Sequence, residues 1–415
     1  MLQRHRAVWF YSLLRDYGER LESWWKAGSL LPAGRFGRDL LHLYFEPRVV
    51  LGRTACEPRT PNHTISGSGP GDIIPSEDQD PPAAKMDACV YVSRHGNFFH
   101  TEIAELLALG LESSGCFDVE RRNESQEPRD AALNLIVAPH EFFGLGEGIR
   151  FRDNPYRPFR RSSSLFLAEQ PGSKHFSACL PFVAESRRTF DLNDQSTRLL
   201  QGLGVDAHFL PVGYVDAPSL FDSDQNALEE NTLTRGMSLE AAMFSKESDR
   251  PVDIAFTGVL TRRRADFFGG HADFFSSRRC VLALPTALEP LGGAVSSTLT
   301  TKEATLLSRR SKIVLNVHRN DAAYFEWHRI MIRGLWQQAL VVTEPSPLPP
   351  GVIDGQHLIQ APLEEIPELL RWLLESEEGR LKAEAVRIAG YRLLLDRYDL
   401  SSWMRGLHGL ISAEQ

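Results

Sequence analysis

Three consecutive arginines follow a predicted strand and a glycine in the second half of this sequence. The segment from Gly258 to Arg264 reads Gly-Val-Leu-Thr-Arg-Arg-Arg and comes directly after the apolar stretch 252–257. A glycine at a strand end lets a ligand approach the backbone closely, and the N-terminus of the next helix attracts anions. Arginine binds phosphate through two parallel hydrogen bonds. We therefore expect Gly258, Arg262 and Arg263 to bind a phosphate group; the alternative is a basic helix start exposed to solvent.

The stretch 312–344 holds the densest group of residues that could bind a ligand. Buried strands are predicted at 312–317 and 339–343, with a loop and a helix between them. The arginines there suit a diphosphate, and the glutamates suit the hydroxyls of a ribose or another sugar. For each residue the alternative is an ion pair that only stabilises the fold, because a buried charge needs a partner. The candidates are His318, Arg319, Glu326, His328, Arg329 and Glu344.

His140 and Glu169 are the candidates for a general base. Each follows a predicted buried strand, at 133–138 and 164–168 respectively. A histidine side chain titrates near neutral pH, so it suits the deprotonation of a hydroxyl group. We predict that His140 is the base, with Glu169 as the second choice. The structural alternative is a histidine hydrogen-bonded beneath the two phenylalanines that follow it.

Strands that alternate with helices position all of these candidates. This alternation predicts parallel sheets, and continuous apolar strands predict sheets covered on both faces. Ligands of such sheets bind beyond the carboxyl ends of the strands, where the candidates lie. Strands are expected at 88–93, 133–138, 164–168, 182–184, 208–212, 252–257, 280–284, 312–317, 339–343 and 357–360. Helices are expected at 98–114, 194–203, 302–310, 327–337, 363–376 and 378–394.

Composition shifts divide the chain into segments. The clearest boundary is a stretch rich in Pro, Gly, Ser and Asp, which has little to bury and is predicted to be a disordered linker. The expected segments are an N-terminal helical arm at 1–52, the linker at 53–86, a first domain at 87–215, a connector at 216–250, a second domain at 251–395 and a terminal helix at 396–415.

Length, charge and cysteine content exclude several classes of protein. The 415 residues suffice for two or three domains, and the formal net charge of −8 argues against a nucleic-acid partner. The five cysteines are an odd number without zinc-site spacing, which favours a reduced, cytoplasmic compartment. The sequence contains no run of 18 apolar residues, so we expect no transmembrane helix. Its N-terminal residues lack the pattern of a signal peptide.

Missing motifs narrow the chemistry further. Neither predicted domain has Gly-x-Gly-x-x-Gly after its first strand, and a P-loop with Gly-Lys-Ser/Thr is missing too. Nicotinamide-dependent hydride transfer and P-loop ATP hydrolysis are therefore disfavoured. No Asp-x-Asp pair lies at a predicted strand end, so we expect no metal site.

The order of the weaker motifs resembles that of a known family. KIVLNVHRN is similar to the "LN-hydrophobic-H" strand, and ALVVTE to the "small–small–Val–Val" strand, of GT-B glycosyltransferases of the bacterial "glycosyl transferases group 1" type. DIAFTGVLTRRR resembles the start of their donor domain, and DLNDQSTRLLQGLGVDAHFLPVGY the end of their acceptor domain. The segment EGRLKAEAVRIAGYRLLLDRYDLSSWMRGL resembles their terminal helices, so that the resemblance spans about 88–405.

This resemblance implies two Rossmann-like α/β domains that face each other across a cleft, preceded by the helical arm. It implies a hexosyltransferase-type enzyme that moves a sugar from a nucleotide-diphosphate sugar to a glycan or other hydroxyl acceptor. The nucleotide sugar is a co-substrate, and no further cofactor is expected. The donor would bind to the second domain, and the first domain would supply the catalytic base.

Two positions depart from the family pattern. Arg333 aligns with a glutamate that many retaining members have on the helix, and Gln338 stands where a glycine is usual. Glu326 or Glu344 would then bind the ribose instead. The alternatives are a noncatalytic module that binds a nucleotide or glycan, and a GT-B-like sugar-nucleotide epimerase or hydrolase. The sequence does not indicate the donor, the acceptor, the stereochemistry or the oligomeric state.

Overall fold

The computed structural model describes residues 73, 75, 84–216, 250–285, 299–321 and 324–413. The predicted arm at 1–52, nearly all of the predicted linker and nearly all of the connector lie outside the described residues. The chain forms two compact units. The first comprises the described residues up to Arg94, Ser114–Pro211 and those from Ser402 onward; the second comprises His95–Ser113 and Val212–Ser401.

The first unit contains a six-stranded sheet in which all neighbouring strands are parallel. Its spatial order is β2-β1-β3-β4-β5-β6. The strands are β1 (Met86–Tyr91), β2 (Phe117–Arg122), β3 (Leu133–Val137), β4 (Ser164–Leu167), β5 (Arg188–Asp191) and β6 (Ala207–Phe209). The parallel sheet and the strands expected at 88–93, 133–138, 164–168 and 208–212 are confirmed.

The strand expected at 182–184 is wrong. These residues end α7 (Lys174–Val183), which begins at the capping residue Ser173 and buries positions at helical spacing. The strand that pairs with β4 is instead β5, with the sequence Arg-Thr-Phe-Asp. It was not predicted because charged residues at both of its ends interrupt the apolar pattern. Strand β2, which no apolar run predicts, pairs with β1 at the edge of the sheet.

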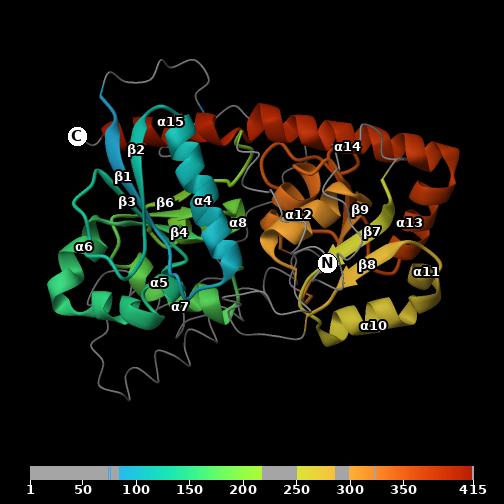
Figure 1. Ribbon diagram of the computed structural model, residues 1–415, viewed down its shortest axis with the longest axis horizontal. Coiled ribbons are helices and arrows are strands. Elements are labelled where there is room, and N and C mark those ends of the chain that lie inside the picture. The colour runs from blue at the N-terminus through green and yellow to red at the C-terminus, as the bar shows by residue number, and fades with distance from the viewer. Residues whose placement is uncertain are drawn as a thin grey trace. The chain divides into compact units, whose positions relative to one another are not determined.

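Helices cover both faces of the first sheet. They are α5 (Pro139–Phe142), η1 (Gly146–Arg152), η2 (Asn154–Tyr156), α6 (Arg157–Ser162), α7, α8 (Asp194–Gly202) and most of α15 (Leu400–Ser412). One face packs an aromatic core against α5, α6 and α7. On α15, His408 contacts Phe117 and Trp403 contacts Phe209. Figure 1 shows α5 and α7 to one side of the sheet and α15 to the other.

The second unit contains a five-stranded parallel sheet in the order β11-β10-β9-β7-β8. Its strands are β7 (Val252–Thr257), β8 (Cys280–Ala283), β9 (Ser311–Asn316), β10 (Leu340–Thr343) and β11 (Ile359–Gln360), close to the predicted bounds. Its helices are α4 (Phe98–Ser113), α10 (Arg262–Gly270), α11 (Ala272–Ser276), α12 (Thr301–Arg309), the π-helix η5 (His328–Leu335), α13 (Ile366–Glu375) and α14 (Glu377–Arg397).

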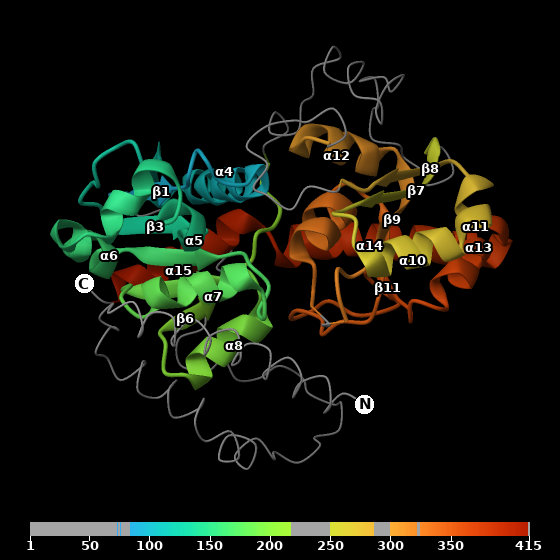
Figure 2. The same ribbon diagram turned by 90° about the horizontal axis from the view of Figure 1, so that it is seen from below.

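Both faces of the second sheet are covered, as its continuous apolar strands predict. Helices α10, α11, α13 and α14 pack on one face through a large apolar core. Helix α12 packs on the other face through Ala304 and Leu307. Figure 2 shows α12 on one side of the strands and α10 and α13 on the other. Because the strands are parallel, the carboxyl ends of β7, β9 and β10 lie at the same edge of the sheet. Helices cover both faces of this sheet.

Among the described residues, Ala138 (φ 50°) and Gln338 (φ 54°) are the two non-glycine residues with a left-handed backbone. That conformation costs a residue with a Cβ atom about 1–2 kcal/mol. Gln338 lies in the short turn between η5 and β10, so the family's usual glycine at this position has a conformational reason.

Candidate functional site

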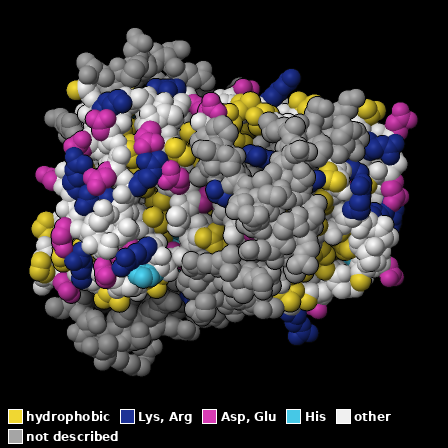
Figure 3. Space-filling view, in the orientation of Figure 1, with side chains coloured by type: hydrophobic (Ala, Val, Ile, Leu, Met, Phe, Trp, Pro, Cys, Tyr) yellow, Lys and Arg dark blue, Asp and Glu magenta, His cyan; other side chains and the backbone are white. Residues whose placement is uncertain are grey.

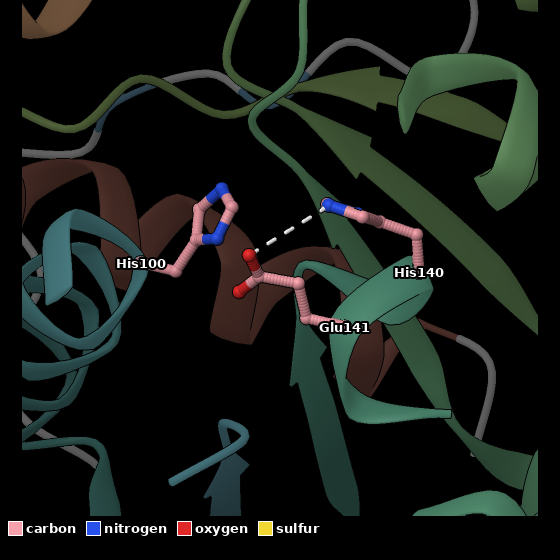
Figure 4. Close-up of side chains that lie close together, drawn as sticks. All are labelled: His100, His140 and Glu141. Atoms are coloured by element: carbon pink, nitrogen blue, oxygen red, sulfur yellow. Dashed lines mark ion pairs between the residues drawn. The ribbon is translucent and has the colours of Figure 1, made fainter. Parts of the chain in front are cut away.

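His140 and Glu169 lie side by side in the first unit. They follow β3 and β4, which are neighbours in the sheet, so the two strand ends bring them together. His140 Nε2 is 3.7 Å from a carboxylate oxygen of Glu169 and 4.0 Å from one of Glu141. Figure 4 shows His140 and Glu141 extending from α5, with this second ion pair dashed. The two residues that the sequence offers as alternative bases therefore form one carboxylate–imidazole group.

Helix α7 approaches the other nitrogen of the same imidazole. His140 Nδ1 is 3.5 Å from Cys179 Sγ, and the ring centroid of His175 is 5.2 Å from that of His140. Burial raises the pKa of the Cys179 thiol well above its ordinary value, so Cys179 is a neutral thiol. The single thiol hydrogen of Cys179 is donated to the carbonyl of His175 at 3.3 Å, so Nδ1 of His140 is the donor toward Sγ, and Nε2, which faces the carboxylates, has the lone pair that can accept a proton.

The backbone before His140 is strained. Ala138 adopts a left-handed conformation immediately before Pro139, where proline restricts the preceding residue further. Its amide donates a hydrogen bond to the carbonyl of Phe166, which anchors the turn to β4. Strain of this kind is concentrated at functional sites, and this turn comes two residues before His140.

In the second unit, the ends of β7, β9 and β10 gather a group of charged residues that we call the arginine cluster. Its members are Gly258, Arg263, Arg264, His318, Glu326, Arg329 and Glu344. Arg263 forms a bidentate ion pair with Glu344, with 2.7 Å for one of its two contacts. It also pairs with Asp321 at 3.0 Å. Glu344 accepts a hydrogen bond of 2.6 Å from the amide of His318 as well.

Arg264 is the buried centre of this cluster, although the sequence does not distinguish it as a candidate from Arg262 and Arg263. Its guanidinium donates hydrogen bonds of 2.8–3.0 Å to the carbonyls of Val317 and Val259. Burial, followed by the neighbouring charge of Arg329, lowers the pKa of Arg264 to about 9. A buried cation beside another cation is costly without an anion nearby, so this site is electrostatically suited to a negatively charged ligand.

Gly258 lets the two guanidiniums converge. A Cβ atom at this position would lie 2.9 Å from Arg264 Nη1 and 3.1 Å from Arg329 Nη2. Arg329 also donates a hydrogen bond of 2.7 Å to Glu326, which lies 3.9 Å from Arg264. Glu326 therefore forms an ion pair, which is the alternative to ligand binding that the sequence left open for it. This pair holds Arg329 in place beside Gly258.

His318 is buried within the arginine cluster. Its side-chain Nε2 has no hydrogen-bond partner within the part of the chain that the structure describes. Burial lowers the pKa of His318, so the imidazole is neutral near pH 7. A buried polar nitrogen without a partner costs roughly 1–3 kcal/mol, which a ligand's hydrogen bond would recover.

Two predicted donor-binding residues lie outside this cluster. The side chain of Arg262 is 94% exposed and pairs with Asp266 at 3.7 Å. Arg319 is exposed, and its charge contributes to the lowered pKa of Arg264. Neither touches the buried group around Arg264, so Arg262 matches the alternative of a solvated helix start.

His328 contacts a residue, Glu102, that was not among the candidates predicted from the sequence. Its Nε2 lies 2.7 Å from Glu102, on α4, and Arg333 lies 2.6 Å from the same carboxylate oxygen. Arg333, which aligns with the family's helix glutamate, is thus an ion-paired residue. Glu102 lies between apolar, buried positions of α4, and that unusual placement is the signal that could have identified it.

Neither a family model nor a curated protein matches this sequence. Its fold, however, is similar to solved structures of glycosyltransferases. An alpha-glucosyltransferase in complex with UDP-glucose and DNA containing an abasic site has a TM-score of 0.50 and 10% identity, over 79% of this chain and 100% of that chain. HepE from Anabaena, in complex with UDP-glucose, has a TM-score of 0.48 and 9% identity, over 79% and 100%. An alpha1,3-fucosyltransferase with GDP-fucose has a TM-score of 0.44 and 9% identity, over 83% and 96%.

Within the described ranges, no helix combines the length and the apolar character needed to cross a membrane. Two parallel sheets, each covered on both faces and each in its own compact unit, match the architecture of the alpha-glucosyltransferase over its full length. The chain therefore has the GT-B fold.

Proposed function

We propose that the protein is a glycosyltransferase that takes a sugar from a nucleotide-diphosphate sugar. The observation that carries this proposal is the convergence of Arg264 and Arg329 on Gly258, at the carboxyl ends of the second unit's strands. Fixed cations at this edge of a parallel sheet are suited to a diphosphate.

The arginine cluster suits the chemistry of a departing nucleoside diphosphate. Arg263, Arg264 and Arg329, together with Arg319, whose charge acts on Arg264, face the three carboxylates of Asp321, Glu326 and Glu344, so one positive charge remains to attract an anion. The glutamates hold the guanidiniums in fixed positions. Cations that are already oriented stabilise the charge that develops on the leaving group without further rearrangement.

In the first unit, we propose His140 as the base that accepts a proton from the acceptor hydroxyl. Glu169 and Glu141 lie near its Nε2 and would stabilise the imidazolium that forms. Glu169 is then a partner of the base instead of an alternative to it. We further propose that the enzyme needs no cofactor besides the nucleotide sugar.

The acceptor that we propose is a glycan or another hydroxyl compound in the cytoplasm. An alpha-glucosyltransferase of this fold was solved with DNA, so the fold alone does not exclude a nucleic acid. On the visible face of the first unit, cationic and anionic side chains are interleaved (Figure 3). In the same unit, Arg129 pairs with both Glu120 and Asp87. Local neutralisation of this kind disfavours a polyanionic acceptor on that face.

The experiment is to incubate the protein with UDP-, GDP-, dTDP- and ADP-sugars, with and without a panel of glycan acceptors. A transferase releases free nucleotide diphosphate only when an acceptor is present. Release without an acceptor would mean a hydrolase or an epimerase-like activity, and binding without turnover would mean a noncatalytic module. If no nucleotide sugar binds at all, the proposed function is wrong.

A further inference from the structure

His328 and Arg333 share the buried carboxylate of Glu102, and we call these three residues, together with Thr305, the Glu102 network. Glu102 Oε2 accepts from Arg333 Nη2 at 2.6 Å and lies 2.7 Å from His328 Nε2. Arg333 Nη1 donates to the hydroxyl of Thr305 at 2.6 Å. The network joins α4 to α12 and η5, which are far from α4 in the sequence.

The charges in this network determine which nitrogen of His328 carries the hydrogen. Burial alone would raise the pKa of Glu102, but the charges and hydrogen bonds of Arg333 and His328 lower it to about 2. Glu102 is thus a carboxylate that can only accept hydrogen bonds, and His328 Nε2 must be the donor. Burial lowers the pKa of His328 despite Glu102, with Arg333 and Arg329 acting in the same direction, so the ring is neutral near pH 7.

A neutral imidazole whose Nε2 carries the hydrogen can accept a hydrogen bond at its other ring nitrogen. Its Nδ1 is a hydrogen-bond acceptor, and the side chain of His328 is 23% exposed, so the residue is not fully enclosed by the protein. Mere packing does not require such an arrangement, because apolar residues can often replace a buried ion pair without loss of stability.

His328 also lies in the right element for contact with the donor. It is the first residue of η5, and the next residue, Arg329, belongs to the arginine cluster. π-Helical turns are rare and occur frequently at functional sites. This turn places the neutral acceptor beside the cation that we assign to the diphosphate.

We propose that His328 selects the donor by accepting, at Nδ1, a hydrogen bond from one of the donor's hydroxyl groups, and that Glu102 is the positioning residue that fixes the ring. This inference rests on the proposed function and deepens it. The hydroxyl belongs either to the ribose or to the transferred sugar, and both offer the same O–H donor.

Binding of UDP, 2′-deoxy-UDP, UDP-glucose, GDP and GDP-fucose should be measured by calorimetry for the wild type and for His328→Ala. One lost hydrogen bond should weaken binding about three- to tenfold. If the hydroxyl is the ribose 2′-OH, the loss occurs with UDP and disappears with 2′-deoxy-UDP. If it belongs to the sugar, the loss occurs with UDP-glucose or GDP-fucose but not with UDP or GDP.

A positioning role for Glu102 has its own readout. Nucleotide-sugar affinity should fall at acid pH, because protonation converts Nδ1 from an acceptor into a donor. Since Glu102 raises the pKa of His328, the Glu102→Gln variant should move this fall to lower pH. A residue that only holds helices together would lower the unfolding temperature and leave the pH profile in place.

His271→Ala, at the end of α10, serves as the control, because His271 contacts neither the Glu102 network nor the arginine cluster among the described contacts. If the wild type binds a nucleotide sugar and His328→Ala binds it equally well, this inference is wrong while the proposed function stands. If the wild type binds none of the probes, both fail together.

Discussion

His140 and Glu169 follow the ends of two neighbouring parallel strands, and 3.7 Å separate the imidazole Nε2 from the carboxylate. They lie 29 positions apart in the sequence, on either side of η1, η2 and α6. Only the pairing of β3 with β4 makes them partners. The pair has the composition of a general base and the group that orients it, and this relationship leads to the first prediction.

His140→Ala should lower kcat by a factor of about 10²–10⁴ and leave the Kd of the nucleotide sugar nearly unchanged, because a base acts in the transition state. Glu169→Gln should give a smaller fall in kcat, since the imidazole remains but loses a carboxylate. Steady-state kinetics and calorimetry measure the two quantities. Wild-type turnover by His140→Ala would remove His140 from the mechanism.

Arg329→Ala and Arg263→Ala should weaken the binding of a nucleoside diphosphate by about 1.5–3 kcal/mol each and leave nucleoside binding nearly unaffected. The reason is that each removes one charged contact at the arginine cluster. Arg262→Ala is the matched control. Because the Arg262 side chain is 94% exposed, this variant should bind the nucleoside diphosphate as the wild type does. Equal weakening of nucleoside and diphosphate binding would contradict a diphosphate site.

Gly258→Ala should weaken nucleoside-diphosphate binding about tenfold or more, since the new methyl group would lie 2.9 Å from Arg264 Nη1 and displace it. Arg264 is buried and bonded to two carbonyls, so it has little room to move. Gly269→Ala, in the nearby helix α10, is the control, because the added methyl group would have no neighbouring atom within 4 Å. This variant should bind the nucleoside diphosphate as the wild type does. Normal binding by Gly258→Ala would show that the two guanidiniums need not converge.

Gln338→Val should destabilise the protein by about 1–2 kcal/mol, because a β-branched residue fits a left-handed backbone poorly. Gln338→Gly should be at least as stable as the wild type. It removes the left-handed strain but also a 3.3 Å contact between the side chain and Arg387. Urea unfolding measures both variants, and a Gln338→Val variant of full stability would refute the conformational argument.

Asp191 should make stability fall as pH rises. Burial raises the pKa of Asp191 to about 7, well above the value of an unfolded aspartate. Between those two pKa values the folded state binds a proton that the unfolded state has lost, so folding is favoured at the acid end and weakened toward pH 7 and above. Asp191→Asn should therefore raise the free energy of unfolding by on the order of a few kcal/mol at pH 8 and change it little at pH 4.

Urea unfolding of both proteins at pH 4, 6 and 8 tests this expectation. Asp206→Asn is the opposite control, because a hydrogen bond from His208 lowers the pKa of Asp206 to about 2. The Asp206→Asn substitution should lower the free energy of unfolding at pH 8 and have a smaller effect at acid pH. The same pH dependence in the Asp191→Asn variant and the wild type would mean that Asp191 is ionised in the folded protein.

The sequence by itself determined most strands of both sheets and their parallel arrangement. Apolar runs such as those of β3, β7 and β9 are long enough to identify a strand, and the polar residues after them mark the ligand-binding edge. The clustering of arginines after Gly258 could be predicted for the same reason, since that signal lies within seven consecutive residues.

Tertiary structure alone decided which of these residues meet. Strand order put His140 beside Glu169, and the packing of α4 in the second unit put Glu102 beside His328 and Arg333. It also turned Arg264 inward and Arg262 outward, although both belong to the same run of arginines. Local periodicity specifies an element and its buried face, whereas pairing between distant elements depends on a global packing that no short window of sequence contains.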